Sequence, residues 1–271
     1  MKDFVNTPAY KKIREFIIQI NKSILTEIQC CNDTVNSFLQ DVYSLLKETE
    51  VNKFLEKQET NAKFNYFHIV LEKKLKSLLE SRFAIENIPI LYKYLFSSFG
   101  NPVRLDYGTG HELNFACFLF SLVELKIMKF NECYTTFLKY FEFIRMMIIE
   151  LQVLPAGSHG VWGIDDYQYL PFLFGSSEMC KITLDGKISD STDNGFYTAV
   201  QHSKTYKTRH SNVSFEKHSP ILYSLQFIEN WSDIHNKIWE LYEKHVLLCL
   251  SVTQHFIYSV LLPEEEKTGA K

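Results

Sequence analysis

Glycine is distributed very unevenly along this 271-residue chain, and its distribution limits where specialised loops can form. No glycine occurs before Gly100, and seven of the ten lie between residues 100 and 175: Gly100, Gly108, Gly110, Gly157, Gly160, Gly163 and Gly175. Glycine is used where the backbone needs a positive φ or where another group approaches closely. The first third is therefore expected to form a helical scaffold, and residues 100–175 to contain purpose-built loops.

Apolar residues recur at helical spacing over much of the chain. In the first segment the apolar stripe runs from Tyr10 to Ile24, and Thr7-Pro8 predicts a cap followed by proline at the first helical position. Similar patterns predict further helices over 33–46, 62–79, 89–97, 112–128 and 132–153, and from residue 232 onward. The segments 112–128 and 132–153 are apolar nearly all round, which indicates burial on most sides. The predicted fold class is all-α, with residues 1–271 as a single globular unit.

Composition excludes several classes of protein. The chain carries 29 basic and 32 acidic residues, so a net charge of −3 provides no bulk attraction to nucleic acid or to an anionic membrane. Its 22 Phe, 15 Tyr and 3 Trp are too much apolar surface for a disordered chain. No apolar run reaches the roughly 20 residues that span a bilayer. The six cysteines show no metal-binding spacing, and no signal peptide is visible. We expect a cytoplasmic protein, with the nucleus as a second compartment.

Residues 180–217 are polar and differ from the rest of the chain. Asp185-Gly186 between two short apolar stretches predicts a small hairpin, and a surface loop is an equal alternative. Residues 201–218, rich in Lys, Ser, Thr and His, are expected to be mobile.

The first segment that indicates chemistry runs from Arg104 to Glu112, where a glycine loop opens into a predicted helix. The N–H groups at a helix N-terminus bind phosphate or carboxylate, and Arg104 would add a fixed cation. The spacing is not that of a P-loop or a Rossmann fingerprint. The alternative is a purely structural turn in which Arg104 and Asp106 form an ion pair.

The second segment, residues 155–177, places glycines around Trp162 and then two adjacent carboxylates, Asp165 and Asp166. Paired acids beside exposed carbonyl groups suit Mg²⁺, which uses one or two carboxylates plus phosphate oxygens. Alternatively, the acids cap a helix that begins near Tyr167. The aromatic residues here would line either an apolar groove for a peptide or the core. A third stretch, Gln254-His255, indicates little by itself, because a histidine among apolar neighbours is more often a core residue.

Together these segments resemble the phosphotyrosyl phosphatase activator family, whose members activate protein phosphatase 2A and are also classed as peptidyl-prolyl isomerases. The residues that carry this resemblance lie at 104–112 and 155–177 and at Gln254-His255-Phe256 and Leu261-Leu262-Pro263, and the resemblance is specific from about residue 99 to 177 and near 254–263. It covers residues 6–263, and 264–271 are expected to form a disordered tail.

The resemblance implies an all-α fold with core, lid and linker subdomains around a deep cleft that takes ATP and Mg²⁺. It places nucleotide contacts at Arg104, Thr109, Gly110, Gln254 and His255. It places the metal at the Gly160 carbonyl and at Asp166. Three departures from the family pattern affect these expectations: Ile257 stands where a basic residue is usual, residues 180–217 differ, and the lead-in near residues 56–63 is missing.

Three functions follow as hypotheses. The first is an activator that binds the scaffold and catalytic subunits of phosphatase 2A, shares ATP·Mg with them and promotes loading of the catalytic metals. The second is peptidyl-prolyl isomerase activity on proline-containing peptides, with Asp106, Trp162 and Tyr167 as candidate catalytic residues. The third is a divergent, binding-only helical scaffold that has lost tight nucleotide binding. A homodimer formed around a peptide is a further arrangement that the family resemblance suggests.

Overall fold

The computed structural model describes residues 3–51, 60–157, 160–184, 194–210 and 213–265, and these are predominantly helical. The all-α prediction is confirmed. The long helices are α1 (Pro8–Thr26), α2 (Asp33–Val51), α3 (Thr60–Glu80), α4 (Ile88–Ser97), α5 (Thr109–Glu124), α6 (Phe130–Leu151), α7 (Leu170–Leu184), α8 (Gly195–His210) and α11 (Trp231–Tyr242). The shorter elements are η1 (Phe4–Asn6), η3 (Ile85–Asn87), η4 (Gly160–Trp162), α9 (Phe215–His218), α10 (Pro220–Ser224), η5 (Leu225–Phe227), η6 (Glu243–Leu247) and α12 (Leu250–Thr253).

The start of α1 follows the prediction from sequence. Pro8 occupies its first turn, and the Thr7 hydroxyl accepts a hydrogen bond from the Tyr10 N–H at 3.2 Å. This cap satisfies one of the N–H groups that an α-helix leaves unpaired at its N-terminus. The apolar stripe of α1 is buried as its spacing predicted.

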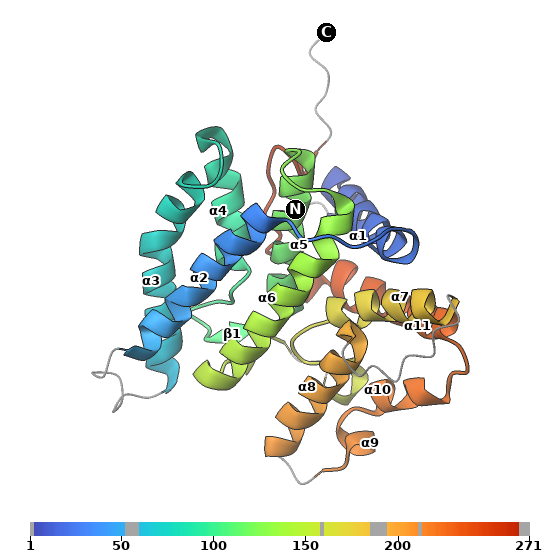
Figure 1. The fold of residues 1–271 in the computed structure, drawn as a ribbon. Coiled ribbons are helices and arrows are strands. Elements are labelled where there is room, and N and C mark those ends of the chain that lie inside the picture. The colour runs from blue at the N-terminus through green and yellow to red at the C-terminus, as the bar shows by residue number, and fades with distance from the viewer. Residues whose placement is uncertain (1–2, 52–59, 158–159, 185–193, 211–212, 266–271) are drawn as a thin grey trace.

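The helices form two groups around α5 and α6, as Figure 1 shows. On one side α2, α3 and α4 pack in sequence order, and on the other side α7 packs against α1, α8 and α11. Ten residues of α5 are buried, including an unbroken run from Phe115 to Leu122. An apolar pattern on all faces thus corresponds to a helix surrounded by others.

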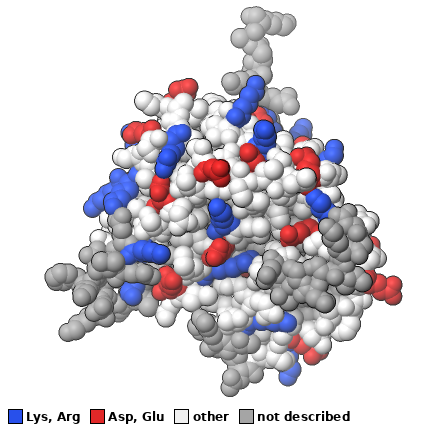
Figure 2. Space-filling view, in the orientation of Figure 1, with Lys and Arg blue, Asp and Glu red and all other residues white. Residues whose placement is uncertain are grey.

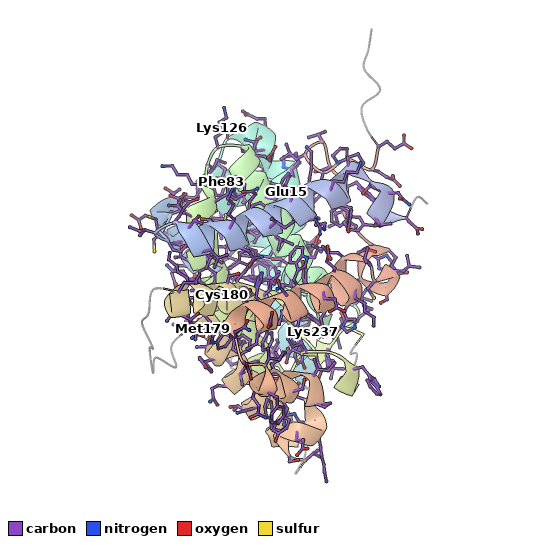
Figure 3. All side chains as sticks on the ribbon, turned by 90° about the vertical axis from the view of Figure 1, so that its right-hand side faces the viewer. Glu15, Phe83, Lys126, Met179, Cys180 and Lys237 are labelled. Atoms are coloured by element: carbon purple, nitrogen blue, oxygen red, sulfur yellow. The ribbon has the colours of Figure 1, made fainter. Side chains whose placement is uncertain are left out.

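Helices α1 and α11 lie on one face of the molecule, where Figure 3 labels Glu15 on α1 and Lys237 on α11. Arg14 joins them, because its guanidinium lies 5.4 Å from the centre of the Trp239 ring and its Nε donates to a Glu243 carboxylate oxygen. The N-terminal helix therefore contacts the segment that leads into the C-terminal motif.

Two glycines allow close approach of backbones. A Cβ on Gly175 would lie 2.2 Å from the Phe196 N, so α7 and α8 cross too closely there for any side chain. A Cβ on Gly108 would lie 2.9 Å from the Ala156 carbonyl oxygen, where β1 (Asp106–Tyr107) and β2 (Leu154–Pro155) pair in parallel. This short pairing, which the sequence did not reveal, joins the two glycine-containing segments.

The prediction for residues 180–217 needs correction. Lys181–Leu184, expected in a hairpin strand or a loop, forms the last turn of α7, and residues 201–210 belong to α8 rather than to a mobile tail. Helix α8 is anchored at its start by the Asn194 side chain, which accepts a hydrogen bond from the Tyr197 N–H at 2.9 Å. The Asp185-Gly186 turn and most of the expected 264–271 tail lie outside the described residues.

The surface carries both charge signs without a dominant field. On the face in Figure 2, Lys and Arg alternate with Asp and Glu, in agreement with the small net charge. Among the described residues no helix is long and apolar enough to cross a membrane.

Candidate functional site

A cavity of about 280 Å³ lies where the N-terminus of α5 meets the C-terminal segment of the chain. Its lining includes all five residues that the family resemblance assigned to a nucleotide: Arg104, Thr109, Gly110, Gln254 and His255. Residues from the second motif, Ala156 and Gly157, close one side. Three segments separated by up to about 150 residues in sequence thus contribute to one cavity.

The N-terminus of α5 presents its first N–H groups here. Gly108 is extended, and its carbonyl oxygen accepts hydrogen bonds from the N–H groups of His111 and Glu112. Thr109 and Gly110 precede these donors, at the positive end of the helix dipole. The cavity therefore combines a helix N-terminus with the Arg104 guanidinium, a donor set that fits phosphate groups.

Arg104 is held beside the cavity by Asp106. Its Nε donates to Asp106 Oδ2 at 2.8 Å, and His111 Nε2 lies 3.7 Å from Oδ1. Partial burial acts to raise the pKa of Asp106, but the nearby His111 ring and the hydrogen bond and charge of Arg104 outweigh it and lower that pKa below its ordinary value. Both alternatives from the sequence are therefore present in one structure, because Arg104 is ion-paired and also lines the cavity.

His255 and Gln254 are exposed on the cavity wall, after the short helix α12. The alternative that His255 is a buried core histidine is therefore wrong. That role belongs to His68, which lies among Phe64, Phe67 and Phe96 and whose pKa burial lowers to about 4.

Asp165 and Asp166 have different environments. Asp165 is buried, and its carboxylate accepts hydrogen bonds from the N–H groups of Tyr167 and Gln168 and from the Ser203 hydroxyl at 2.9 Å. It is a structural cap. Asp166 is half-buried, so the two adjacent acids differ in their exposure to solvent.

The proposed metal residues do not line the cavity. Gly160 is exposed with φ +55°, in a loop where a Cβ would meet nothing within 4 Å. Over the described ranges, no cluster of three or more His, Cys, Asp or Glu side chains could hold a metal ion. The Asp166 carboxylate and the Gly160 carbonyl fit Mg²⁺ only if phosphate and water supply the other ligands, which is the usual way that proteins bind this ion.

The three candidate isomerase residues are spread over different environments. Trp162 is 77% exposed, and Asp106 lines the cavity. Tyr167 is 2% exposed, and its hydroxyl is hydrogen-bonded to the Val153 carbonyl oxygen and to the Tyr206 hydroxyl. Its ring therefore belongs to the core and presents no surface to a peptide.

Ile257 lies in a second, smaller cavity, of about 180 Å³, between α4 and the C-terminal segment. Its carbonyl oxygen accepts a hydrogen bond from the Tyr94 hydroxyl at 2.9 Å. The Ile257 side chain does not line the first cavity.

The sequence analysis missed Glu112, a fully buried carboxylate at the start of α5. Both of its oxygens accept hydrogen bonds from the N–H groups of Tyr169 and Leu170, at 3.0–3.2 Å. Burial raises its pKa to about 8, although these hydrogen bonds act in the opposite direction. Arg145 is the nearby cation, and burial lowers its own pKa to about 10. The available signal was an acidic residue on the first turn of an otherwise apolar helix.

The overall arrangement of helices matches that of a solved phosphatase activator. A crystal structure of the PP2A phosphatase activator Ypa1 superposes with a TM-score of 0.75 at 22% identity, over 97% of this chain and 91% of the other. The family model described as Phosphotyrosyl phosphate activator (PTPA) protein matches residues 1–264, so the chain belongs to this family.

Curated relatives support the same assignment. The serine/threonine-protein phosphatase 2A activator of Encephalitozoon cuniculi is 35% identical over 99% of this chain and 97% of its own length. A probable serine/threonine-protein phosphatase 2A activator 2 of Dictyostelium discoideum is 30% identical over 97% of this chain, which spans 62% of that longer protein.

Proposed function

We propose that this protein activates protein phosphatase 2A by binding its scaffold and catalytic subunits. Family membership over residues 1–264 supports this function, as does the name of the Encephalitozoon relative, which matches along nearly its whole length. The observation that carries the mechanism is the single cavity formed by three distant motifs.

ATP is the ligand that we assign to this cavity. The site offers a guanidinium, the N-terminus of α5 and polar side chains from the C-terminal segment, which together suit a polyanion with a base attached. Its volume of about 280 Å³ is at the small end for ligand pockets, which are commonly about 300–1,000 Å³. The cavity therefore suits part of a nucleotide, and the rest would face a bound phosphatase.

The roles of the chain's own residues follow from their positions. Arg104, oriented by Asp106, would neutralise phosphate charge, and the N–H groups of Thr109 and Gly110 would donate hydrogen bonds to further phosphate oxygens. Gln254 and His255 would fix the orientation of the nucleotide. Mg²⁺, bound by Asp166 and the Gly160 carbonyl together with phosphate, would supply charge neutralisation that assists loading of the phosphatase metals.

Peptidyl-prolyl isomerase activity is the second candidate, and the exposed ring of Trp162 favours it. A nearly free indole on a structured loop provides an apolar surface for a proline ring. Asp106 is the remaining polar candidate. An isomerisation assay on a proline-containing peptide, without phosphatase, tests this activity, and Trp162→Ala should abolish it. Isomerisation unchanged in that variant would exclude Trp162 as the proline contact.

The alternative is a binding-only scaffold that no longer binds nucleotide tightly. Co-purification with the scaffold–catalytic pair, with and without ATP·Mg, separates it from the shared-nucleotide activator. For the activator we expect retention that nucleotide strengthens and that Arg104→Ala loses. Arg82→Ala is the matched control, since Arg82 is also a surface arginine paired with an aspartate, Asp41 at 2.9 Å, but does not line the cavity. Retention indifferent to nucleotide and to Arg104 would support the scaffold.

A further inference from the structure

A π-helix precedes the wall of the cavity that carries Gln254 and His255. It spans Glu243–Leu247, and the Leu248 N–H donates to the Glu243 carbonyl oxygen at 2.8 Å, five residues back. A π-turn accommodates one residue more than an α-turn and occurs mostly as an isolated bulge, often at a functional site. Its presence sets where the helix ends, at Leu248, and so where the extended Cys249 and α12 begin.

Two contacts hold this turn from opposite sides. Arg14 of α1 binds Glu243, the first residue of the turn, through its Nε. The Tyr169 hydroxyl and His245 Nδ1 lie 2.8 Å apart in a hydrogen bond, and Tyr169 is 1% exposed. The second contact reaches the middle of the π-turn from within the protein.

Tyr169 is in turn fixed by Glu112, whose carboxylate accepts its backbone N–H. Glu112 belongs to the first turn of α5, and its neighbours His111 and Leu113 line the cavity. The connection therefore runs from one wall of the cavity, through the start of α7, to the turn that leads to the opposite wall. Across the cavity the two walls also meet directly, since a Cβ on Gly110 would lie 3.6 Å from the Val252 carbonyl oxygen.

We propose that Tyr169 and His245 are positioning residues that keep the Glu243–Leu247 turn in its π form and so direct Gln254 and His255 into the cavity. If the turn relaxed to α-helical geometry, Leu248 at the end of the helix would shift by about 100° around the helix axis, the angle per residue of an α-helix. The extended Cys249 would then start α12 from a different position, and Gln254 and His255 would move relative to the N-terminus of α5. For its ligand, this inference rests on the proposed nucleotide function.

Amide hydrogen exchange of residues 249–256, without nucleotide, is the first measurement, on the full chain. Tyr169→Phe and His245→Leu should each speed exchange of this segment, and the double variant should match the single ones. His245→Asn should restore wild-type protection, because Asn Oδ1 occupies the position of His Nδ1. Tyr134→Phe is the control, since it removes a buried hydroxyl bonded to Glu178 at 2.8 Å, at a site that does not line the cavity.

The second measurement is the affinity for ATP·Mg, titrated directly. We expect Tyr169→Phe and His245→Leu to weaken it about tenfold, the usual scale for one lost buried hydrogen bond. Tyr134→Phe and His245→Asn should retain it. Unchanged exchange in Tyr169→Phe, or exchange equally raised in Tyr134→Phe, overturns the positioning role. An affinity for ATP·Mg that is unchanged in Tyr169→Phe overturns the proposed effect of Tyr169 on ligand binding. If the wild type binds no ATP, the nucleotide assignment fails, and the exchange result still decides the positioning role.

Discussion

Arg104 donates its Nε to Asp106 Oδ2 at 2.8 Å while its side chain remains about half exposed beside the cavity. An exposed ion pair of this kind contributes little to folding, because solvent screens it. The pair instead restricts the directions in which the guanidinium can point, and this contact uses its Nε rather than its two Nη atoms. Arg104 is therefore expected to matter little for the folding stability of the protein and much for binding of a ligand in the cavity.

The first prediction follows from this expectation. Arg104→Ala should change the free energy of unfolding by less than about 1 kcal/mol, the ordinary range for an exposed ion pair. It should nevertheless abolish stabilisation of the protein by ATP·Mg. Urea unfolding with and without nucleotide measures both effects. Full nucleotide stabilisation in the variant would remove Arg104 from the phosphate site.

The second prediction concerns Gly110, which lies in the first turn of α5. An added Cβ would meet Val252 atoms at 3.6 and 3.7 Å, which is ordinary contact, so Gly110→Ala should fold normally. Replacing a helical glycine by alanine stabilises by about 0.5–1 kcal/mol. The methyl group also enters the cavity, so ATP affinity should fall. Thermal unfolding tests the gain in stability, and nucleotide titration tests the loss of ATP affinity. An undiminished ATP affinity would contradict the expectation that the methyl group obstructs the cavity.

The third prediction concerns Gly175. A Cβ there would lie 2.2 Å from the Phe196 N and 2.7 Å from its Cα, which requires α7 and α8 to separate. Because backbone cannot yield as a flexible side chain can, Gly175→Ala should destabilise by about 3 kcal/mol or more. Gly157→Ala is the comparison: it has φ +67° but nothing within 4 Å, so only about 1 kcal/mol of strain is expected. Denaturant unfolding measures both variants. Equal losses of unfolding free energy in Gly175→Ala and Gly157→Ala would show that α7 and α8 adjust freely.

Much of this fold could be predicted from periodicity, and the failures have a common physical origin. The stripes of α1 to α6 and α11 depend on residues three or four apart, which the sequence displays directly. Helix α8 has a polar exterior, and its stability depends on α7 crossing at Gly175, a contact that only the tertiary structure reveals. Its polarity therefore suggested a mobile tail.

The candidate site, too, could be predicted only in part from the sequence. Short-range patterns identified the α5 N-terminus and Arg104, but the family resemblance was needed to assign His255. Glu112 was missed because its partners, the N–H groups of Tyr169 and Leu170, lie nearly sixty residues away. The local signal, an acidic residue on the first turn of an apolar helix, does not reveal partners at this distance along the chain.

The fourth prediction distinguishes the adjacent acids. Asp165→Asn should destabilise by about 1–3 kcal/mol, because it removes the negative charge near the Arg145 guanidinium and weakens the hydrogen bonds that the carboxylate accepts from two N–H groups and the Ser203 hydroxyl. Asp166→Asn should require more Mg²⁺ for nucleotide binding. Denaturant unfolding checks the stability of Asp165→Asn, and magnesium titration of nucleotide binding checks Asp166→Asn. Coincident magnesium curves for Asp166→Asn and wild type would remove Asp166 from the metal site.

The fifth prediction concerns the buried carboxyl of Glu112 and the pH dependence of stability. Burial raises its pKa to about 8 in the folded protein, against roughly 4.3 in an unfolded chain. The folded state therefore holds a proton that the unfolded state has lost between these values. By linkage, this contribution to stability is fully present below about pH 4 and is lost as pH rises toward 8.

Glu112→Gln removes this titration while keeping the shape of the side chain. The variant should be less stable at pH 5, because its amide group places donors against the N–H groups of Tyr169 and Leu170. The gap between wild type and variant should narrow as pH rises from 5 to 8, by at most about 1.4 kcal/mol per pH unit. His68, whose pKa is lowered, titrates in both proteins and cancels in the difference. Parallel stability curves across this range would mean that the Tyr169 and Leu170 N–H groups keep Glu112 ionised in the folded protein.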